Sequence, residues 1–222
     1  MAKKRVLVVG AKGKMGLKVS EILKSDYEIV GVKRGDIWHD FKADLVIDFG
    51  SAESSVLSAE YAFKNKVPLI VGSTGQSDSD IKKIRRVSEV APLMICSNFS
   101  VGVVLLKKCI DVLMKEKISD ICIFEKHHRA KKDIPSGTAI SIEKFISSKT
   151  NVPVQMLAER GGEEIGTHKV DFYFKSELIS VSHTAFSRKV FAEGAAKAVD
   201  FLICQKEPKE YFFDDIIWQT SA

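Results

Sequence analysis

Residues 6–16 read VLVVGAKGKMG, and this stretch decides the fold class of the chain. Four apolar residues with a preference for β-structure run directly into three glycines spaced three residues apart. A helical pattern follows, whose apolar face consists of Met15, Val19, Ile22 and Leu23. A strand, a glycine turn and an amphipathic helix in this order are typical of the first unit of a dinucleotide-binding domain.

Each of the three glycines has its own role in such a turn. Gly10 permits the tight turn after the strand, Gly13 lets the backbone approach a pyrophosphate, and Gly16 lets helix and strand pack closely. The N-terminus of the helix then presents free N–H groups to the phosphates. The motif predicts a dinucleotide site, and a glycine-rich turn without a ligand is the alternative.

Outward from this motif, short apolar runs alternate with longer stretches of helical period. The apolar runs are residues 6–9, 29–32, 45–49, 69–71 and 93–96. Continuous apolar strands joined by helices indicate a parallel sheet covered on both faces. We therefore expect an α/β fold whose first domain is a Rossmann-like, doubly wound parallel sheet.

The hydrophobic pattern changes after Ser97. A helix with an apolar face leads to a strand near residues 120–126, and a second helix is expected from about Thr138 to Ser148. Apolar and polar residues alternate over 170–174 and 179–183, on either side of a polar turn, which predicts an antiparallel pair. This order of helices and alternating strands predicts a second, α+β domain with a mixed sheet. A late amphipathic helix that begins at Phe191 could return to the first domain.

Composition excludes several classes of protein. The 222 residues are 45% hydrophobic and 28% charged, so the chain can bury a core without disulfide or metal staples. The net charge of +5 is too small to indicate a nucleic-acid partner, although it is compatible with the binding of a small anionic ligand. No apolar run is long enough to span a bilayer, and the four cysteines are widely spaced. We expect a cytoplasmic protein with reduced thiols and no membrane or nucleic-acid partner.

Residues at the ends of other predicted strands extend the dinucleotide site. Gly72-Ser73-Thr74-Gly75 and Ser97-Asn98-Phe99-Ser100 follow the fourth and fifth strands, at the carboxyl edge where open α/β sheets bind ligands. Lys33 and Arg34 end the second strand, where a basic residue accommodates the 2′-phosphate of NADP. They favour NADPH or the use of both cofactors. A solvated loop is the alternative, because Asp36 lies close by.

The richest polar segment, residues 125–138, reads EKHHRAKKDIPSGT. Cationic and protonatable side chains precede a Pro-Ser-Gly-Thr that opens a helix, so cations and helix N–H groups can converge on one anion. Adjacent His127 and His128 make an acid/base site credible, because imidazole titrates near neutral pH. A solvated basic turn is the alternative. We expect no metal, because neighbouring cations disfavour a divalent ion.

This segment and others resemble the 4-hydroxy-tetrahydrodipicolinate reductase (dihydrodipicolinate reductase) family. The pattern E-x-H-H-x-x-K-x-D-x-P-S-G-T-A is present from Glu125 to Ala139. The resemblance extends over nearly the whole chain through further matching segments: the N-terminal glycine motif, Asp48-Phe49, 72–75, 97–102, 160–168, 183–188 and 191–195. It implies reduction of a small cyclic dicarboxylate by NADH or NADPH in lysine and diaminopimelate biosynthesis. It also implies a dinucleotide-binding domain of residues 1–99 and 189–222, and a substrate-binding domain of residues 100–188 that forms a homotetramer.

The resemblance also implies roles for individual residues. His127 is expected to be the acid/base and Lys131 a proton donor. The residues expected to bind substrate are His128, Ser136, Gly137 and Thr138. The residues expected to bind the cofactor are Gly10, Ala11, Lys12, Gly13, Lys14, Met15, Gly72, Ser73, Thr74, Cys96, Ser97, Asn98 and Phe99. Lys33 and Arg34 join this set through their position at the end of the second strand and not through the resemblance.

Two other functions stay open at this point. Another nicotinamide-dependent oxidoreductase acting on a small amino or keto acid fits the first domain but leaves the His-His-x-x-Lys segment unexplained. A non-catalytic dinucleotide sensor that binds nucleic acid lacks any recognisable nucleic-acid motif. Among the other histidines, His39 is expected at the surface, while His168 and His183 could be structural or line the cleft. Residues 172–174 are expected in the sheet core or at a subunit interface.

Overall fold

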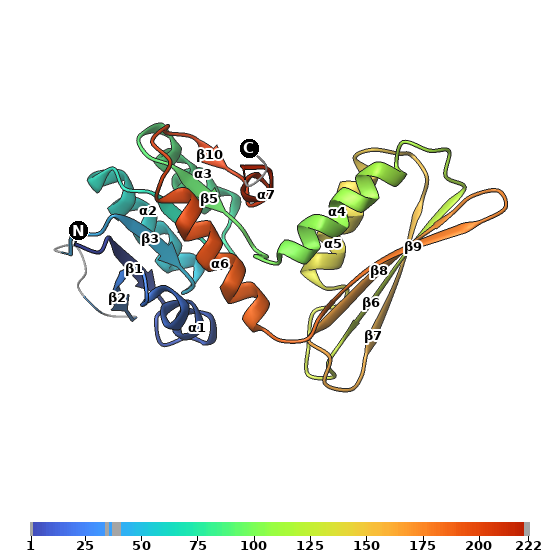
Figure 1. The fold of residues 1–222 in the computed structure, drawn as a ribbon, viewed down its shortest axis with the longest axis horizontal. Coiled ribbons are helices and arrows are strands. Elements are labelled where there is room, and N and C mark those ends of the chain that lie inside the picture. Colours follow the sequence, from blue (N-terminus) through green and yellow to red (C-terminus); the bar gives the residue numbers. More distant parts are fainter. Residues whose placement is uncertain (1, 34–35, 37–40, 220–222) are drawn as a thin grey trace. The chain divides into compact units, whose positions relative to one another are not determined.

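The computed structural model describes residues 2–33, 36 and 41–219, so Arg34 and His39 lie outside the described residues. The chain divides into two compact units, one of Met1–Phe99 with Phe191–Ala222 and the other of Ser100–Val190 (Figure 1). Each unit has its own sheet.

The sheet of the first unit has six parallel strands in the order β10-β5-β4-β3-β1-β2. The strands are β1 (Arg5–Val9), β2 (Glu28–Val32), β3 (Leu45–Asp48), β4 (Leu69–Val71), β5 (Leu93–Ile95) and β10 (Glu210–Tyr211). The central strands are fully buried because both faces of the sheet are covered, which explains their continuous apolar runs. The predicted doubly wound parallel sheet is confirmed. Its strand order reverses between β1 and β3, where such sheets form a crevice at the carboxyl ends of the strands.

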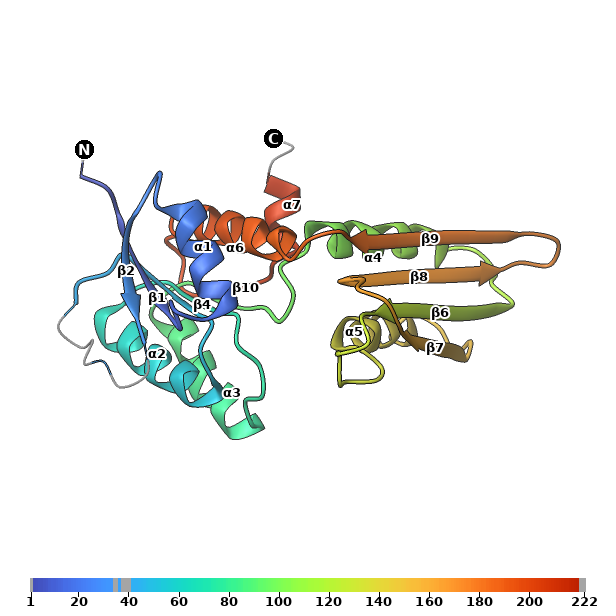
Figure 2. The same ribbon diagram turned by 90° about the horizontal axis from the view of Figure 1, so that it is seen from below.

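Helices lie on both sides of this sheet. They are α1 (Lys14–Leu23), α2 (Ala52–Asn65), α3 (Asp78–Arg85), the 3₁₀ turn η1 (Arg86–Glu89), α6 (Lys189–Leu202) and α7 (Asp215–Gln219). Figure 2 shows α1 and α6 on one side of the sheet and α2 and α3 on the other. Serine side chains accept hydrogen bonds from backbone N–H groups at the starts of α2 and α3, which fixes where these helices begin. No helix within the described ranges is both long enough and apolar enough to cross a bilayer.

The second unit is a four-stranded mixed sheet with two helices. Its strands are β6 (Asp120–His127), β7 (Val154–Arg160), β8 (Gly166–Tyr173) and β9 (Leu178–Ala185), in the order β7-β6-β8-β9. β6 is parallel to β7 and antiparallel to β8, and β8 and β9 form the predicted antiparallel pair. The helices α4 (Val101–Leu113) and α5 (Gly137–Ser147) contribute to one apolar core with β6 and β8.

We call the side of this sheet that meets α4 and α5 the covered face. On β6 it carries residues 121, 123, 125 and 127, and on β8 it carries residues 166, 168, 170 and 172, all of them buried. Apolar side chains occupy this face toward one end, including Ile121, Ile123 and Phe172. Toward the other end the same face turns polar, which places titratable side chains in a dry environment.

Candidate functional site

The glycine loop after β1 has the geometry that its sequence predicts. Gly10 has a φ of 75°, a conformation that glycine adopts without a steric penalty, and its N–H donates to the Val32 carbonyl at 3.0 Å. A Cβ on Gly16 would lie 2.3 Å from the Gly10 carbonyl oxygen, so only glycine lets α1 approach the turn this closely. Gly13 is the N-cap of α1 and supplies no side-chain cap. The first N–H groups of α1 are thus left without a capping side chain, as an anion site requires.

The segments after β3 and β4 are held together by the buried carboxylate of Asp48. It accepts hydrogen bonds from the Gly50 N–H at 2.8 Å and the Ser58 hydroxyl at 2.6 Å, while the Asp48 carbonyl accepts from the Gly72 N–H at 2.8 Å. Burial raises the pKa of Asp48, and the hydrogen bonds from Ser58 and Gly50 oppose that shift. Asp48 is thus a structural anchor for the loop of Gly72, Ser73 and Thr74.

Aromatic rings pack where these loops meet the segment after β5. The Phe49 and Phe99 rings are 5.7 Å apart, edge to face, and a Cβ on Gly72 would lie 2.4 Å from the Phe49 ring. Cys96 is buried and donates its thiol to the Asn98 carbonyl at 3.1 Å. The structure therefore brings the three loops that the sequence singles out to one edge of the sheet.

The residues at this edge fit a dinucleotide. The uncapped start of α1 can take phosphate oxygens, and the side chains of Lys12 and Lys14 beside it are exposed. Lys33 at the end of β2 is exposed as well, but its N–H donates to the Asp36 carboxylate at 3.0 Å, and its ammonium lies 3.9 Å from that group. Asp36 thus offers a carboxylate beside the cation that the sequence predicts to bind a 2′-phosphate.

The basic segment of the second unit begins on β6 and continues as a loop into α5. Lys131, one quarter exposed, forms an ion pair with Asp133, its Nζ being 2.8 Å from Oδ1. The pairing lowers the pKa of Asp133. His128 donates its backbone N–H to the Glu164 carbonyl at 2.8 Å, and its Nε2 lies 3.3 Å from the Arg188 guanidinium. Two cationic side chains therefore lie at this loop: Lys131 belongs to the loop itself, and Arg188 comes from a later segment of the chain.

Ser136 ends the loop as the N-cap of α5, and its hydroxyl accepts from the Ala139 N–H at 3.2 Å. The next residues, Gly137 and Thr138, are exposed and half-buried, respectively, in the first turn of α5. A carboxylate at this turn would meet backbone N–H groups and the positive end of the helix dipole. The Ser136 side chain itself is buried and faces away from solvent.

Sequence reasoning missed two residues that organise this site, Glu125 and Arg160. The fully buried Glu125 carboxylate bonds to His127 Nδ1, accepts from the Arg160 guanidinium at 2.6 Å and accepts from the Ser136 N–H at 3.2 Å. Arg160 also donates to the Asp133 carbonyl at 2.6 Å. A usable signal was present, because Glu125 stands two residues before His127 on a strand, and residues two apart share a face.

His168 joins the same cluster from β8. Its Nε2 lies 3.1 Å from the Ser136 hydroxyl, and its ring meets the His127 ring edge to face with centroids 5.1 Å apart. A similar pair starts α4, where the Ser100 hydroxyl lies 3.2 Å from His183 Nε2. His168 and His183 are cross-strand partners, so the two helices begin over one histidine pair. Both histidines therefore have a structural role at helix starts.

Burial sets the protonation of the histidines. Burial lowers the pKa of His127, and the nearby Lys131 and Arg160 charges act in the same direction, against the pull of Glu125. Burial, assisted by the His127 charge, lowers the pKa of His168 to about 4. The pKa of His183 is lowered by burial as well. These three imidazoles are consequently neutral at pH 7.

We expect His168 to make the protein lose stability in mild acid. Its ordinary pKa of 6.5 applies to the unfolded chain and a pKa of about 4 to the folded one, so the unfolded chain binds the proton first. The contribution is complete above pH 6.5 and is lost as the pH falls toward 4, at a cost of about 3 kcal/mol. Urea unfolding at pH 7 and pH 4.5 measures this, and the loss should be smaller in His168→Gln. Equal losses in both proteins would contradict it.

Glu125, His127 and His168 also bring three potential metal ligands within 4.8 Å of one another. The carboxylate is already bound to the Arg160 guanidinium, which a divalent cation would have to displace. The positive charge of Lys131 also lowers the pKa of His127, which indicates a positive potential at this ligand. The cluster therefore fits a proton-handling site better than a cation site.

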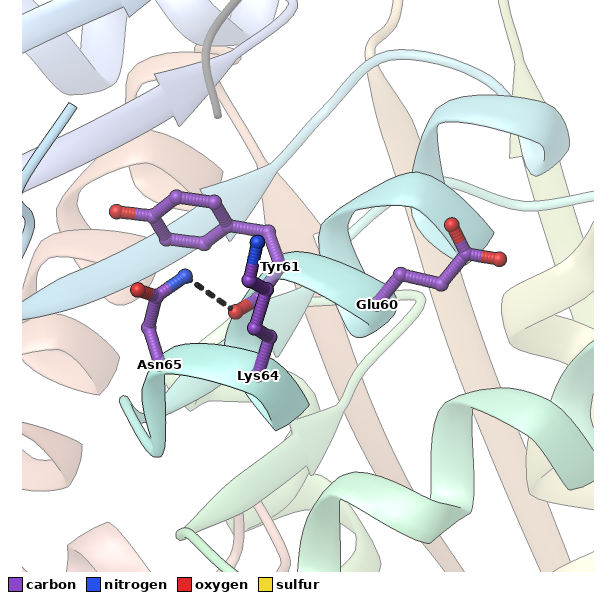
Figure 3. A pocket seen from close by; sticks show the side chains of 4 residues that line it. All are labelled: Glu60, Tyr61, Lys64 and Asn65. Atoms are coloured by element: carbon purple, nitrogen blue, oxygen red, sulfur yellow. Dashed lines mark hydrogen bonds between the residues drawn. The ribbon is translucent and has the colours of Figure 1, made fainter. Parts of the chain in front are cut away.

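A separate hollow of about 190 Å³ lies on α2. Its lining side chains, drawn in Figure 3, are Glu60, Tyr61, Lys64 and Asn65. These residues lie in the C-terminal half of α2, which leads to the amino end of β4. The hollow is thus at the sheet edge opposite the glycine loop. Its volume is below the range of about 300–1,000 Å³ that is usual for small-molecule sites.

Comparisons with known proteins identify relatives of this chain. Family models described as dihydrodipicolinate reductase match residues 35–99 (N-terminus) and 102–217 (C-terminus). The 4-hydroxy-tetrahydrodipicolinate reductase of Campylobacter jejuni is 33% identical over 96% of this chain and 98% of that protein. The enzyme of that name from Bdellovibrio bacteriovorus is 31% identical over 100% of this chain and 99% of that protein.

Solved structures share the fold. Dipicolinate-bound dihydrodipicolinate reductase from Paenisporosarcina sp. TG-14 has a TM-score of 0.80 at 19% identity, covering 96% of this chain and 99% of that one. Aspartate dehydrogenase from Thermotoga maritima has a TM-score of 0.56 at 14% identity, covering 90% and 96%. The matches to both family models and to full-length relatives favour the reductase over the dehydrogenase, and the chain belongs to the dihydrodipicolinate reductase family.

Proposed function

We propose that this protein reduces 4-hydroxy-tetrahydrodipicolinate, with NADH or NADPH as the reductant, in lysine and diaminopimelate biosynthesis. The observation that carries the proposal is the polar end of the covered face. There the Glu125 carboxylate joins His127 to the start of α5, and Arg160 joins that carboxylate to the Asp133 carbonyl in the loop with Lys131. The relatives from Campylobacter jejuni and Bdellovibrio bacteriovorus bear the name of this activity over their full length.

The first unit is the dinucleotide-binding domain and the second is the substrate-binding domain in this proposal. The start of α1 with Lys12 and Lys14 binds the pyrophosphate, and residues 72–74 and 96–99 hold the nicotinamide end. When bound, the reduced nicotinamide supplies a hydride to the unsaturated ring of the substrate. The edge-to-face Phe49 and Phe99 rings exclude water beside these segments.

Two carboxylates of the substrate need cations and N–H donors. We assign one carboxylate to the first turn of α5, at Gly137 and Thr138, with Ser136 holding that turn in place. His128, beside the Arg188 guanidinium, anchors the other. The planar dicarboxylate dipicolinate is bound by the structural relative from Paenisporosarcina. We expect this chain to bind it with one carboxylate at the first turn of α5.

Proton transfer completes the reduction, because hydride arrival leaves electron density that a proton must neutralise. Lys131 has an ammonium group within a loop that is partly shielded from water, and we assign the proton donation to it. His127 is the acid/base that exchanges protons beside it, and the Lys131 charge lowers the pKa of His127.

A coupled assay tests the function. Freshly synthesised 4-hydroxy-tetrahydrodipicolinate is added with NADH or NADPH, and the loss of absorbance of the reduced cofactor is followed. We expect turnover that pyridine-2,6-dicarboxylate inhibits in competition with substrate. Turnover with a simple amino or keto acid in place of this substrate would favour an amino acid dehydrogenase instead.

The cofactor preference gives a separate prediction. Replacing Lys33 and Arg34 together by alanine should raise the KM for NADPH roughly 30-fold and leave the KM for NADH nearly unchanged. Each partly exposed phosphate contact contributes about 1 kcal/mol, and NADH lacks the 2′-phosphate. Steady-state kinetics with both cofactors measure it. An equal rise for both cofactors would show that these residues do not read the phosphate.

The same proposal includes a homotetramer in the cytoplasm. On the face of the second sheet away from α4 and α5, Leu157, Tyr173 and Leu178 are 41–55% exposed, and an apolar sheet face of this kind suits a subunit interface. The cysteines, all free, suit a reducing compartment. Light scattering with size-exclusion chromatography tests the assembly, and a mass near that of one chain would reject it.

A further inference from the structure

Glu125 stands where a charged side chain is least expected. It is on the covered face of β6 between Ile123 and His127, and none of its surface is exposed. A buried carboxylate without partners is strongly unfavourable, so its presence requires compensation. The compensation comes from three donors on three different elements.

Two of those donors, His127 and Ser136, belong to the proposed site. One Glu125 oxygen bonds to His127 Nδ1, and the other accepts from the Arg160 guanidinium at 2.6 Å and the Ser136 backbone N–H at 3.2 Å. Arg160 comes from the end of β7, and Ser136 starts α5. A single carboxylate therefore joins the proposed acid/base to the helix turn that is proposed to bind a substrate carboxylate.

The carboxylate is ionised at neutral pH. Burial raises the pKa of Glu125, but hydrogen bonds from Arg160 and His127, with their charges, outweigh burial and hold it below its ordinary value. An ionised carboxylate can only accept hydrogen bonds, so the proton of neutral His127 is on Nδ1 and its Nε2 carries a lone pair. Gly166 leaves room for this edge of the ring, because a Cβ there would lie 2.7 Å from Nε2.

We propose that Glu125 is a positioning residue, which fixes the tautomer and orientation of His127 and locks that ring to the first turn of α5. This inference rests on the proposed function and adds a residue to it. The charged and titratable groups around His127 are Glu125 on β6, Arg160 on β7, His168 on β8 and Lys131 in the following loop. Among these, only the carboxylate favours the protonated imidazole.

Glu125→Gln keeps the shape of the side chain and removes its charge. We expect kcat to fall roughly 100-fold or more, because a buried carboxylate that orients a catalytic imidazole contributes orders of magnitude to rate. The KM for the cofactor should stay within twofold. The limb of the kcat pH profile that belongs to His127 should move to lower pH, since the amide no longer stabilises the imidazolium. A merely structural role would not move that limb.

Glu159→Gln is the matched control, because Glu159 is a neighbouring carboxylate on β7 that is half exposed and paired with Lys126. This variant should keep the wild-type kcat and pH profile. If Glu125→Gln does the same while folded, the inference is overturned.

A measurement on the wild-type protein holds even if Glu125→Gln does not fold. Nitrogen-15 NMR of labelled histidine should show the Nδ1–H tautomer for His127 near pH 8. The Nε2–H tautomer there would overturn the inference. A wild-type protein without turnover of the synthesised substrate would instead reject the proposed function, and the tautomer would still report on the contact between Glu125 and His127.

Discussion

Lys131→Ala and His127→Ala should each lower kcat for substrate reduction by roughly two to four orders of magnitude, the usual range for losing a positioned acid or base. Lys131 has an ammonium held by Asp133 at 2.8 Å, and His127 is buried with its Nδ1 bound to Glu125. Both groups therefore have fixed positions before substrate arrives. Cofactor binding should change little, because the proposed cofactor residues belong to the other unit.

Lys132→Ala is the matched control for the lysine. Its side chain is exposed next to Lys131, so the variant removes an equal charge from the same loop and should keep kcat within a few fold. The double change at His127 and Lys131 should cost less than the sum of the single changes, since both serve one proton transfer. Near-normal kcat in both single variants would leave the loop as an anion-binding turn, with the proton coming from water.

The parts of the fold that depend on local pattern could be predicted. The apolar run of β1, the glycine turn and the helical period of α1 lie within nineteen consecutive positions, 5–23, and each is set by neighbours in the chain. The start of α5 was also predictable, because Ser136 follows Pro135 and has the side chain that N-caps favour. Interactions between residues close in the chain determine these features, so the sequence alone is sufficient to predict them.

The buried part of the candidate site depends on strand register instead. Arg160 on β7 reaches Glu125 on β6 across 35 positions, and His168 on β8 reaches Ser136 at the start of α5 across 32. The first contact exists because β7 pairs with β6, and the second because the pairing of β8 with β6 brings His168 to the polar end of the covered face. A shift of one residue would turn these side chains to the opposite face. No local pattern sets that register, which is why His168 could be interpreted only as structural or cleft-lining and why Glu125 received no role.

Gly194→Ala should lower the melting temperature by roughly 10 °C. A Cβ on Gly194 would lie 1.7 Å from the carbonyl oxygen of Phe99, so α6 or the Phe99 backbone must move. Steric overlap of this kind in a packed core costs about 3 kcal/mol, which for a protein of this size corresponds to about 10 °C. Phe99 is also held between the Phe49 and Phe213 rings, so a shift there would spread into both. Differential scanning fluorimetry measures the change.

The sign of the change in melting temperature of Gly194→Ala shows whether steric overlap or helix propensity has the larger effect at this position. In a helix interior, alanine is more favourable than glycine by about 1 kcal/mol, so propensity alone predicts that Gly194→Ala raises the melting temperature. Gly137→Ala is the control, because a Cβ at that position in α5 would have no atom within 4 Å, and it should keep or slightly raise the melting temperature. A rise in both variants would contradict the close approach of α6 to Phe99. A fall in Gly194→Ala alone, with a higher KM for the cofactor, would show that α6 supports the segment 96–99 that is proposed to bind it.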